Sequence, residues 1–162
     1  MKKITPLVKG LISGVLMVGI SLLLNYTGRA NSAKAQYLFY ILYAGAITWT
    51  LLGYYRSENY HPSFGSIFGQ GFRCFIIITL ITVIFVAVYT STHPEVQKEA
   101  LELYEADLKK DGNRNEAERE KMIASAKKQF LTGQVSLATF GSLITGAVFT
   151  AAGAGLLLMR KK

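Results

Sequence analysis

Three side chains near one expected membrane boundary could perform acid–base chemistry on a lipid. Glu58, His61 and Arg73 carry a carboxylate, an imidazole and a guanidinium on the side of the membrane that we expect to be cytoplasmic. Such chemistry needs these groups to lie within hydrogen-bonding distance of one another, and proximity along a loop does not establish that. A lipid-converting enzyme is therefore the weakest of three functional hypotheses, and we predict that the protein is not an enzyme and has no catalytic residue.

Other sequence signatures of chemistry are missing. No phosphate-binding glycine loop, nucleophile elbow, HExxH motif or cysteine pair is present. Cys74 is the only cysteine, which excludes an intramolecular disulfide and a cysteine metal cluster. His61 and His93 fall on opposite sides of the expected membrane, so they cannot share a metal ion. We expect no cofactor and no metal. No ionisable residue lies near the centre of an expected span, where a proton or ion pathway would normally place one.

The composition is typical of an integral membrane protein. Of the 162 residues 51% are hydrophobic, and they gather in long uncharged runs. The net charge of +8 is scattered over the ends of these runs and one mixed-charge loop, instead of forming one basic stripe. We therefore expect membrane lipid around the protein and no nucleic acid partner.

The apolar runs predict an all-α, polytopic membrane protein with four transmembrane helices and one membrane domain, 1–162. The spans are expected at about 7–25, 37–55, 72–90 and 134–159, with a charged extracytoplasmic helical hairpin at about 94–131 between the third and fourth. The first run also has the form of a signal peptide. The cleavage-like Ala33-Lys34-Ala35 lies far beyond it, however, so we expect a retained span.

The stretch 61–73 organises the chain, because a polar loop ends there and the chain turns back into the membrane as the third span. Pro62 and Ser63 favour the start of a helix. Aromatic residues then recur every four positions beside a small-xxx-small glycine pair, a pattern that favours contact with another helix, although an ordinary interfacial helix is the simpler alternative. Similar small-residue faces occur near the start of span one and along span four. The predicted helix-packing or partner-binding residues are Phe64, Gly65, Phe68, Gly69, Phe72, Arg73, Gly10, Gly14, Ser142, Gly146 and Thr150.

The segment after His93 is expected to lie in water, since residues 93–129 hold nine of the ten acidic residues. Pro94 opens a helix, Asp111-Gly112-Asn113 breaks it, and Asn115 caps a second helix with Glu118 three residues on. Its expected apolar positions are Val96, Ala100, Leu103, Tyr104 and Leu108 in the first helix, and Ile123, Ala126 and Phe130 in the second. The hairpin is either a solvated connection or a docking surface for a partner.

Charge at the span ends predicts the orientation. With Met1-Lys2-Lys3 and Lys9 read as a flank of span one, and Arg160-Lys161-Lys162 closing span four, both termini are strongly positive. The stretch after span three has no basic residue until Lys98. We therefore expect both termini in the cytoplasm of a bacterial cell, with the protein in the inner membrane.

These features together resemble a family of small four-helix bacterial inner-membrane proteins known as domain of unknown function 4199. The carriers are Met1-Lys2-Lys3, the Ser63–Arg73 entry to span three, the charged loop after His93-Pro94, and the basic end Arg160-Lys161-Lys162. The resemblance covers essentially the whole chain and implies four spans with a helical extracytoplasmic insert. It supplies no activity. Family members often have a proline before the last span, where this chain has Thr132-Gly133.

Three functions follow from these expectations. The first is a non-enzymatic accessory or assembly subunit, which binds another integral membrane protein or a second copy of itself through its glycine faces and the outer hairpin. The second is a small transporter, or one component of an oligomeric transporter, for a lipid-linked or small neutral substrate. The third is the lipid-converting enzyme described above.

Overall fold

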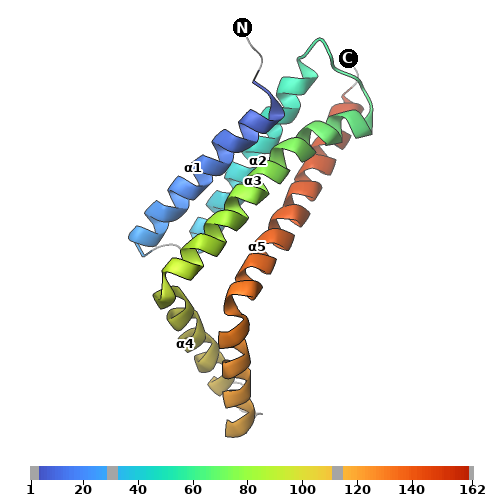
Figure 1. Ribbon diagram of the computed structural model, residues 1–162. Helices are drawn as coiled ribbons and strands as arrows, with labels where there is room; N and C mark the ends of the chain where they lie inside the picture. The colour runs from blue at the N-terminus through green and yellow to red at the C-terminus, as the bar shows by residue number, and fades with distance from the viewer. Residues whose placement is uncertain (1–3, 29–32, 111–114, 161–162) are drawn as a thin grey trace. The chain divides into compact units, whose positions relative to one another are not determined.

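The computed structural model describes residues 4–28, 33–110 and 115–160, and the regular secondary structure of this part is all helical, with no strand. The helices are α1 (Pro6–Tyr26), α2 (Ala33–Tyr55), α3 (Phe64–Thr92), α4 (Pro94–Lys110) and α5 (Glu116–Met159) (Figure 1). The expectation of an all-α protein is confirmed. Met1-Lys2-Lys3, the expected break at Asp111-Gly112-Asn113 and Lys161-Lys162 lie outside the described residues.

Local signals in the sequence set several helix boundaries. Thr5 Oγ1 accepts a hydrogen bond from Val8 N at 3.4 Å ahead of Pro6, and the Ser63 side chain accepts one from Ser66 N at 3.3 Å. These side chains satisfy N–H groups that have no partner within the helix. At the other end of α1, Gly28 takes a positive φ of 65°, a conformation that a residue without Cβ adopts at little cost. The predicted cap at Ser63 is confirmed, although α3 begins after Pro62 and not at it.

Four of the helices are long and apolar enough to cross a membrane: Pro6–Tyr26, Lys34–Tyr55, Phe64–Thr92 and Glu116–Met159. The helix α5 runs through Thr132 and Gly133 without interruption. The second hairpin helix and the fourth span, predicted as separate segments, are joined in one helix of 44 residues. Since neither residue is a proline, the backbone hydrogen bonds can continue there.

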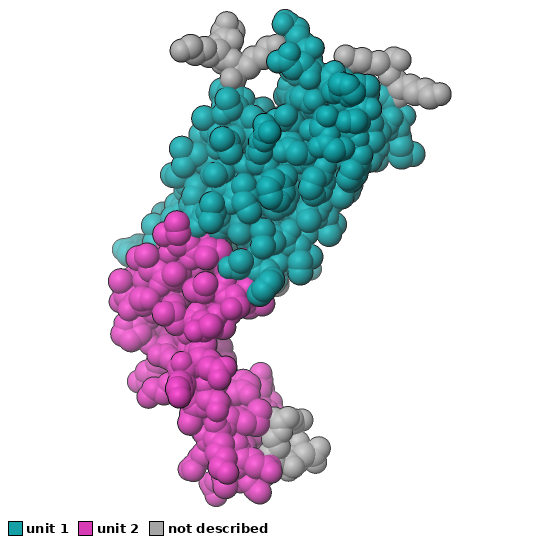
Figure 2. Space-filling model, turned by 45° about the vertical axis from the view of Figure 1, so that its right-hand side comes forward, with its two compact units in different colours: residues 1–82, 139–162 teal, residues 83–138 magenta. Residues whose placement is uncertain are grey.

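The chain divides into two compact units (Figure 2). Unit 1 comprises residues 1–82 and 139–162, and unit 2 comprises residues 83–138. In unit 1, the start of α1 and the end of α5 lie at the same end of the helix bundle (Figure 1). The core of this unit includes fully buried Phe75, Ile47, Ile67 and Ile78. These side chains come from α2 and α3, so α3 is a central helix of unit 1.

Unit 2 consists of the end of α3, α4 and the first part of α5. The Gln97 side-chain amide donates to the Lys127 carbonyl at 2.8 Å, which ties the two helices together. The predicted cap of the second helix is confirmed, because Asn115 Oδ1 accepts a hydrogen bond from Glu118 N at 2.9 Å. Leu108 is buried as expected, but Leu103 is 60% exposed. The apolar stripe predicted for α4 is therefore only partly covered.

Candidate functional site

The glycines of α1 allow close contact with α3 inside unit 1. A Cβ atom on Gly10 would lie 2.5 Å from the Cys74 carbonyl oxygen, and one on Gly14 would lie 2.7 Å from Ile81 Cδ1. Both separations are too short for a real Cβ. Glycine at these two positions therefore lets the backbones of α1 and α3 approach each other, which larger residues would prevent.

The small-residue face of α5 packs against α2 and α3 in the same unit. A Cβ on Gly146 would lie 2.6 Å from the Phe75 ring and 2.9 Å from the Tyr43 hydroxyl oxygen. Thr150 is fully buried and contacts Gly71 of α3 directly. The predicted residues Ser142, Gly146 and Thr150 thus all face partners within this chain.

A buried tyrosine joins three helices at this level of the bundle. The Tyr43 hydroxyl of α2 lies 3.1 Å from the Ser142 carbonyl oxygen of α5 and 3.2 Å from the Thr79 hydroxyl of α3. A buried phenol needs such partners, because an unsatisfied hydroxyl is costly in an apolar interior. Tyr43 is only 4% exposed, so its hydrogen bonds stabilise the bundle and are not available to solvent.

The glycine pair at the start of α3 behaves differently. A Cβ added to Gly65 or to Gly69 would meet no atom within 4 Å. Beside them the rings of Phe64, Phe68 and Phe72 stack in a row, with centroid separations of 5.7 Å and 6.4 Å. Phe64 is 48% and Phe72 is 44% exposed. We call the five residues Phe64, Gly65, Phe68, Gly69 and Phe72 the open face of α3.

Arg73 directly follows the open face, and its side chain is exposed. Of the predicted site residues, the structure therefore brings Gly10, Gly14, Ser142, Gly146 and Thr150 into interior contacts, and leaves the open face and Arg73 at the surface. The predicted site residues therefore belong to two kinds of surface, one that packs inside the helix bundle and one that is exposed.

A buried lysine is the main feature that sequence reasoning missed. Lys9 lies in the first turn of α1 and is only 7% exposed. Its ammonium group donates to the Trp49 carbonyl oxygen of α2 at 3.2 Å and sits over the Trp49 ring, 5.1 Å from the centroid. From the sequence, Lys9 is expected at the flank of span one. Thr5-Pro6 was the signal that could have corrected this, because a capping residue before a proline starts the helix ahead of Lys9.

The two histidines make local contacts in the structure. His61 N donates to the Tyr54 hydroxyl at 3.1 Å, a contact of the backbone and not of the imidazole. In unit 2, His93 Nδ1 lies 2.9 Å from the Thr92 hydroxyl, and the ring stacks on Tyr89. Within the described part of the chain, no three His, Cys, Asp or Glu residues are grouped so as to hold a metal ion.

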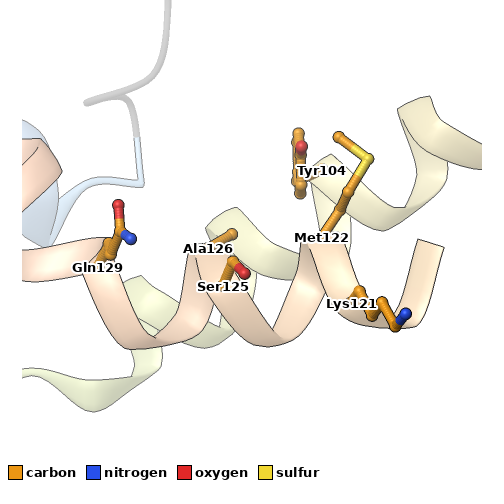
Figure 3. A pocket seen from close by; sticks show the side chains of 6 residues that line it. All are labelled: Tyr104, Lys121, Met122, Ser125, Ala126 and Gln129. Carbon is orange, nitrogen blue, oxygen red and sulfur yellow. The ribbon is translucent and has the colours of Figure 1, made fainter. Parts of the chain in front are cut away.

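Unit 2 contains an open groove of about 330 Å³ along the first part of α5. Tyr104 of α4 and Met122 of α5 lie at one end of the groove and Gln129 lies at the other (Figure 3). Ala126 and Ser125 lie between them. Tyr104 is 36% exposed, so an aromatic side chain that the sequence placed on a buried stripe is in part a surface group.

Four helices that are long and apolar enough to span a bilayer, packed through glycines, define the class: an integral membrane protein. A family model described as a protein of unknown function, DUF4199, matches residues 9–160, and the chain belongs to this family. The resemblance noted from the sequence is confirmed. No curated protein and no solved structure matches the chain.

Proposed function

We propose that this protein is a non-enzymatic accessory or assembly subunit of the bacterial inner membrane, which binds another integral membrane protein or a second copy of itself. The observation that carries the proposal is the open face of α3. Gly65 and Gly69 meet nothing within 4 Å, although they repeat the spacing by which Gly10 and Gly14 bring α1 against α3. Among the described residues nothing makes the contact that such a pair permits, so a helix from outside the chain can fill this place.

Lipid contact alone accounts for the aromatic residues of this face but not for its glycines. Phenylalanine suits a lipid-facing surface, whereas a glycine inside a helix costs about 1 kcal/mol relative to alanine. Five further helical glycines, Gly19, Gly45, Gly133, Gly141 and Gly155, also meet no atom within 4 Å. None of them stands four residues from another open glycine. Gly65 and Gly69 therefore have a four-residue spacing that the other open glycines lack.

Unit 2 supplies a second contact surface in this proposal. We place α4 and the first part of α5 outside the cytoplasm as a helical hairpin, with the groove at Tyr104 and Met122 as its docking surface. The orientation rests on charge: with both termini in the cytoplasm, the inner side carries eight basic residues against one acid, whereas the outer side carries ten against nine. Basic residues close to the span ends favour the cytoplasmic side.

Affinity purification from native membranes in mild detergent, with mass spectrometry and a size measurement, tests the proposal. The wild-type chain is expected to carry a stoichiometric companion or to form a defined oligomer. Gly69→Leu should remove that association, because the leucine side chain keeps a second helix at a distance. Gly19→Leu is the matched control, since Gly19 is an exposed helical glycine that also meets no atom within 4 Å.

An unchanged complex size with Gly69→Leu would contradict the proposal. A lipid product formed by the purified wild-type chain would contradict its non-enzymatic part, and His61→Ala would then test whether the imidazole is needed.

One observation favours a second function, a small transporter or transport component for a lipid-linked or small neutral substrate. Thr150 Oγ1 is buried and has no hydrogen-bond partner among the described residues. A polar solute passing between α3 and α5 would provide one. Under this reading the wild-type chain in liposomes gives flux that Thr150→Val reduces, while an accessory subunit alone gives none.

A further inference from the structure

The ammonium group of Lys9 lies at a seam between α1 and α2 that opens to the outside of unit 1. The stem of the side chain is covered, since the residue is 7% exposed. Its tip, however, touches two surface positions of α2. Trp49 is 43% exposed, and Gly53 is an exposed glycine so close to Lys9 Nζ that any Cβ there would displace the ammonium. Lys9 therefore buries its carbon chain and presents its charge at a seam.

This charge has no carboxylate to balance it in the described part of unit 1. The contact that fixes the ammonium is the neutral Trp49 carbonyl, which uses one of its three N–H donors. Glu58 is the single acid among the described residues of the unit, which also holds the cations Lys9, Lys34, Arg56, Arg73 and Arg160. An uncompensated cation within an apolar helix bundle is costly and marks a functional site.

A second cation stands on the same face of α2. Arg56 directly follows α2, and its N–H still donates to the Leu52 carbonyl at 3.1 Å, so the spacing of four and three residues puts Trp49, Gly53 and Arg56 on one side. Arg56 is exposed and lies about 4.5 Å further along the helix axis than Gly53, at about 1.5 Å per residue. The ammonium of Lys9 and the guanidinium of Arg56 thus border one strip of surface, with an indole at its inner end.

Lys9 and Arg56 lie near helix ends, where the headgroup region of a surrounding bilayer is expected. Lys9 is the fourth residue of α1, which puts it about 4.5 Å from the start of the helix. Tryptophan is enriched at the membrane–water interface, where its ring contacts chains and its N–H meets polar groups. A phosphate at this depth can accept hydrogen bonds from both cations while its acyl chains lie along Trp49.

We propose that Lys9, Trp49, Gly53 and Arg56 form a binding site for the phosphate headgroup of an anionic phospholipid. Lys9 holds the phosphate, Gly53 leaves the room beside α2 that the ammonium itself occupies, and Arg56 takes a second oxygen. The site is independent of the open face of α3, because its residues come from α1 and from α2 and its end.

Trp49 allows a direct test because it is the only tryptophan in the chain. The full chain is reconstituted in bilayers that contain brominated phosphatidylglycerol or brominated phosphatidylcholine, whose bromines quench a tryptophan in contact with them. The ratio of the two quenching curves gives the preference for the anionic lipid. One lysine near an anionic headgroup contributes about a five-fold preference, equivalent to about 1 kcal/mol, and we expect wild type to show it.

Three variants separate the site from general charge. Lys9→Met should lower the preference several-fold, whereas Lys34→Met, which removes an exposed lysine at the start of α2, should leave it unchanged. Gly53→Ser keeps every charge but displaces the ammonium, so it should lower the preference as well. If Lys9→Met fails to give the helical content of wild type, Gly53→Ser decides the question alone.

A wild-type preference near one overturns the proposal, and so do equal losses in Lys9→Met and Lys34→Met. Inorganic phosphate in the aqueous phase should leave the quenching unchanged. Relief of quenching by phosphate would assign the strip to a soluble anion and overturn the lipid assignment.

Discussion

The two glycine pairs of unit 1 have the same spacing and opposite surroundings. Gly10 and Gly14 lie against α3, where an added Cβ would come within 2.5 Å and 2.7 Å of other atoms, whereas Gly65 and Gly69 face empty space. The difference teaches that a small-xxx-small pattern shows only that a close approach is possible. The partner that uses it is decided by the rest of the fold, and for Gly65 and Gly69 no described residue of this chain is that partner.

The strongest test of this difference is to add a side chain to the inner pair, Gly10 and Gly14. Gly10→Ala places a methyl group 2.5 Å from a backbone oxygen, which cannot move away as a side-chain tip could. We expect unfolding in detergent to become easier by about 1–3 kcal/mol, the usual cost of overpacking a core. Gly19→Ala on the same helix is the control, and equal stability of the two variants would show that the α1–α3 contact is not tight.

Adding a side chain to the outer pair, Gly65 and Gly69, should raise the free energy of unfolding instead of lowering it. Gly65→Ala adds a methyl group that meets no atom within 4 Å and replaces glycine by a better helix former. We expect the isolated chain to gain roughly 0.5–1 kcal/mol of unfolding free energy. Loss of stability in this variant would mean that the face is already in use within the chain.

Removing a hydrogen-bonding group from the interior of unit 1 should lower the free energy of unfolding less than Gly10→Ala does. Tyr43→Phe deletes the hydroxyl that lies near the Ser142 carbonyl and the Thr79 hydroxyl, at almost no change in volume. Hydrogen bonds between membrane helices are worth about 0.6 kcal/mol on average, so we expect a loss of that order. A double variant with Thr79→Val shows whether the two hydroxyls act together, since the second change should then add little.

Lowering the pH should weaken an ion pair in unit 2 and leave the glycine pairs of unit 1 unaffected. This is the smallest of the four expected effects. The ammonium of Lys109, 2.7 Å from Glu105, lowers the pKa of that carboxyl below its ordinary value of 4.5. The folded state then holds the proton more weakly than the unfolded state. The contribution to stability is complete above pH 4.5 and is lost as the pH falls through the lowered pKa. Because the pair is exposed, the loss should be slight and should vanish in Glu105→Gln.

Helix boundaries could be predicted from the sequence wherever a local signal sets them. Ser63, Pro94 and Asn115 start helices as expected, because a cap or a proline acts within one turn of its own position. The join between the hairpin helix and the fourth span was harder to predict. Gly133 weakens a helix but does not end it without a following signal, so one continuous helix was compatible with the same residues.

The roles of the predicted site residues depended on partners distant in the sequence. The same glycine spacing describes Gly10 and Gly65, and only the position of α3 against α1 distinguishes them. The burial of Lys9 was missed because its contacts come from Trp49 and Gly53, forty or more residues later. Sequence reasoning selected small residues at helical spacing, but it could not assign each to an inner or an outer surface.

Cys74 gives the inner contact a built-in reporter. It is the only cysteine of the chain, it is fully buried, and its carbonyl oxygen is the atom that Gly10 approaches. A maleimide reagent can reach this thiol only while the neighbouring helices are apart. The labelling rate therefore measures how often the bundle opens there, and comparing the rate in lipid, in detergent and with a partner bound requires no engineered probe.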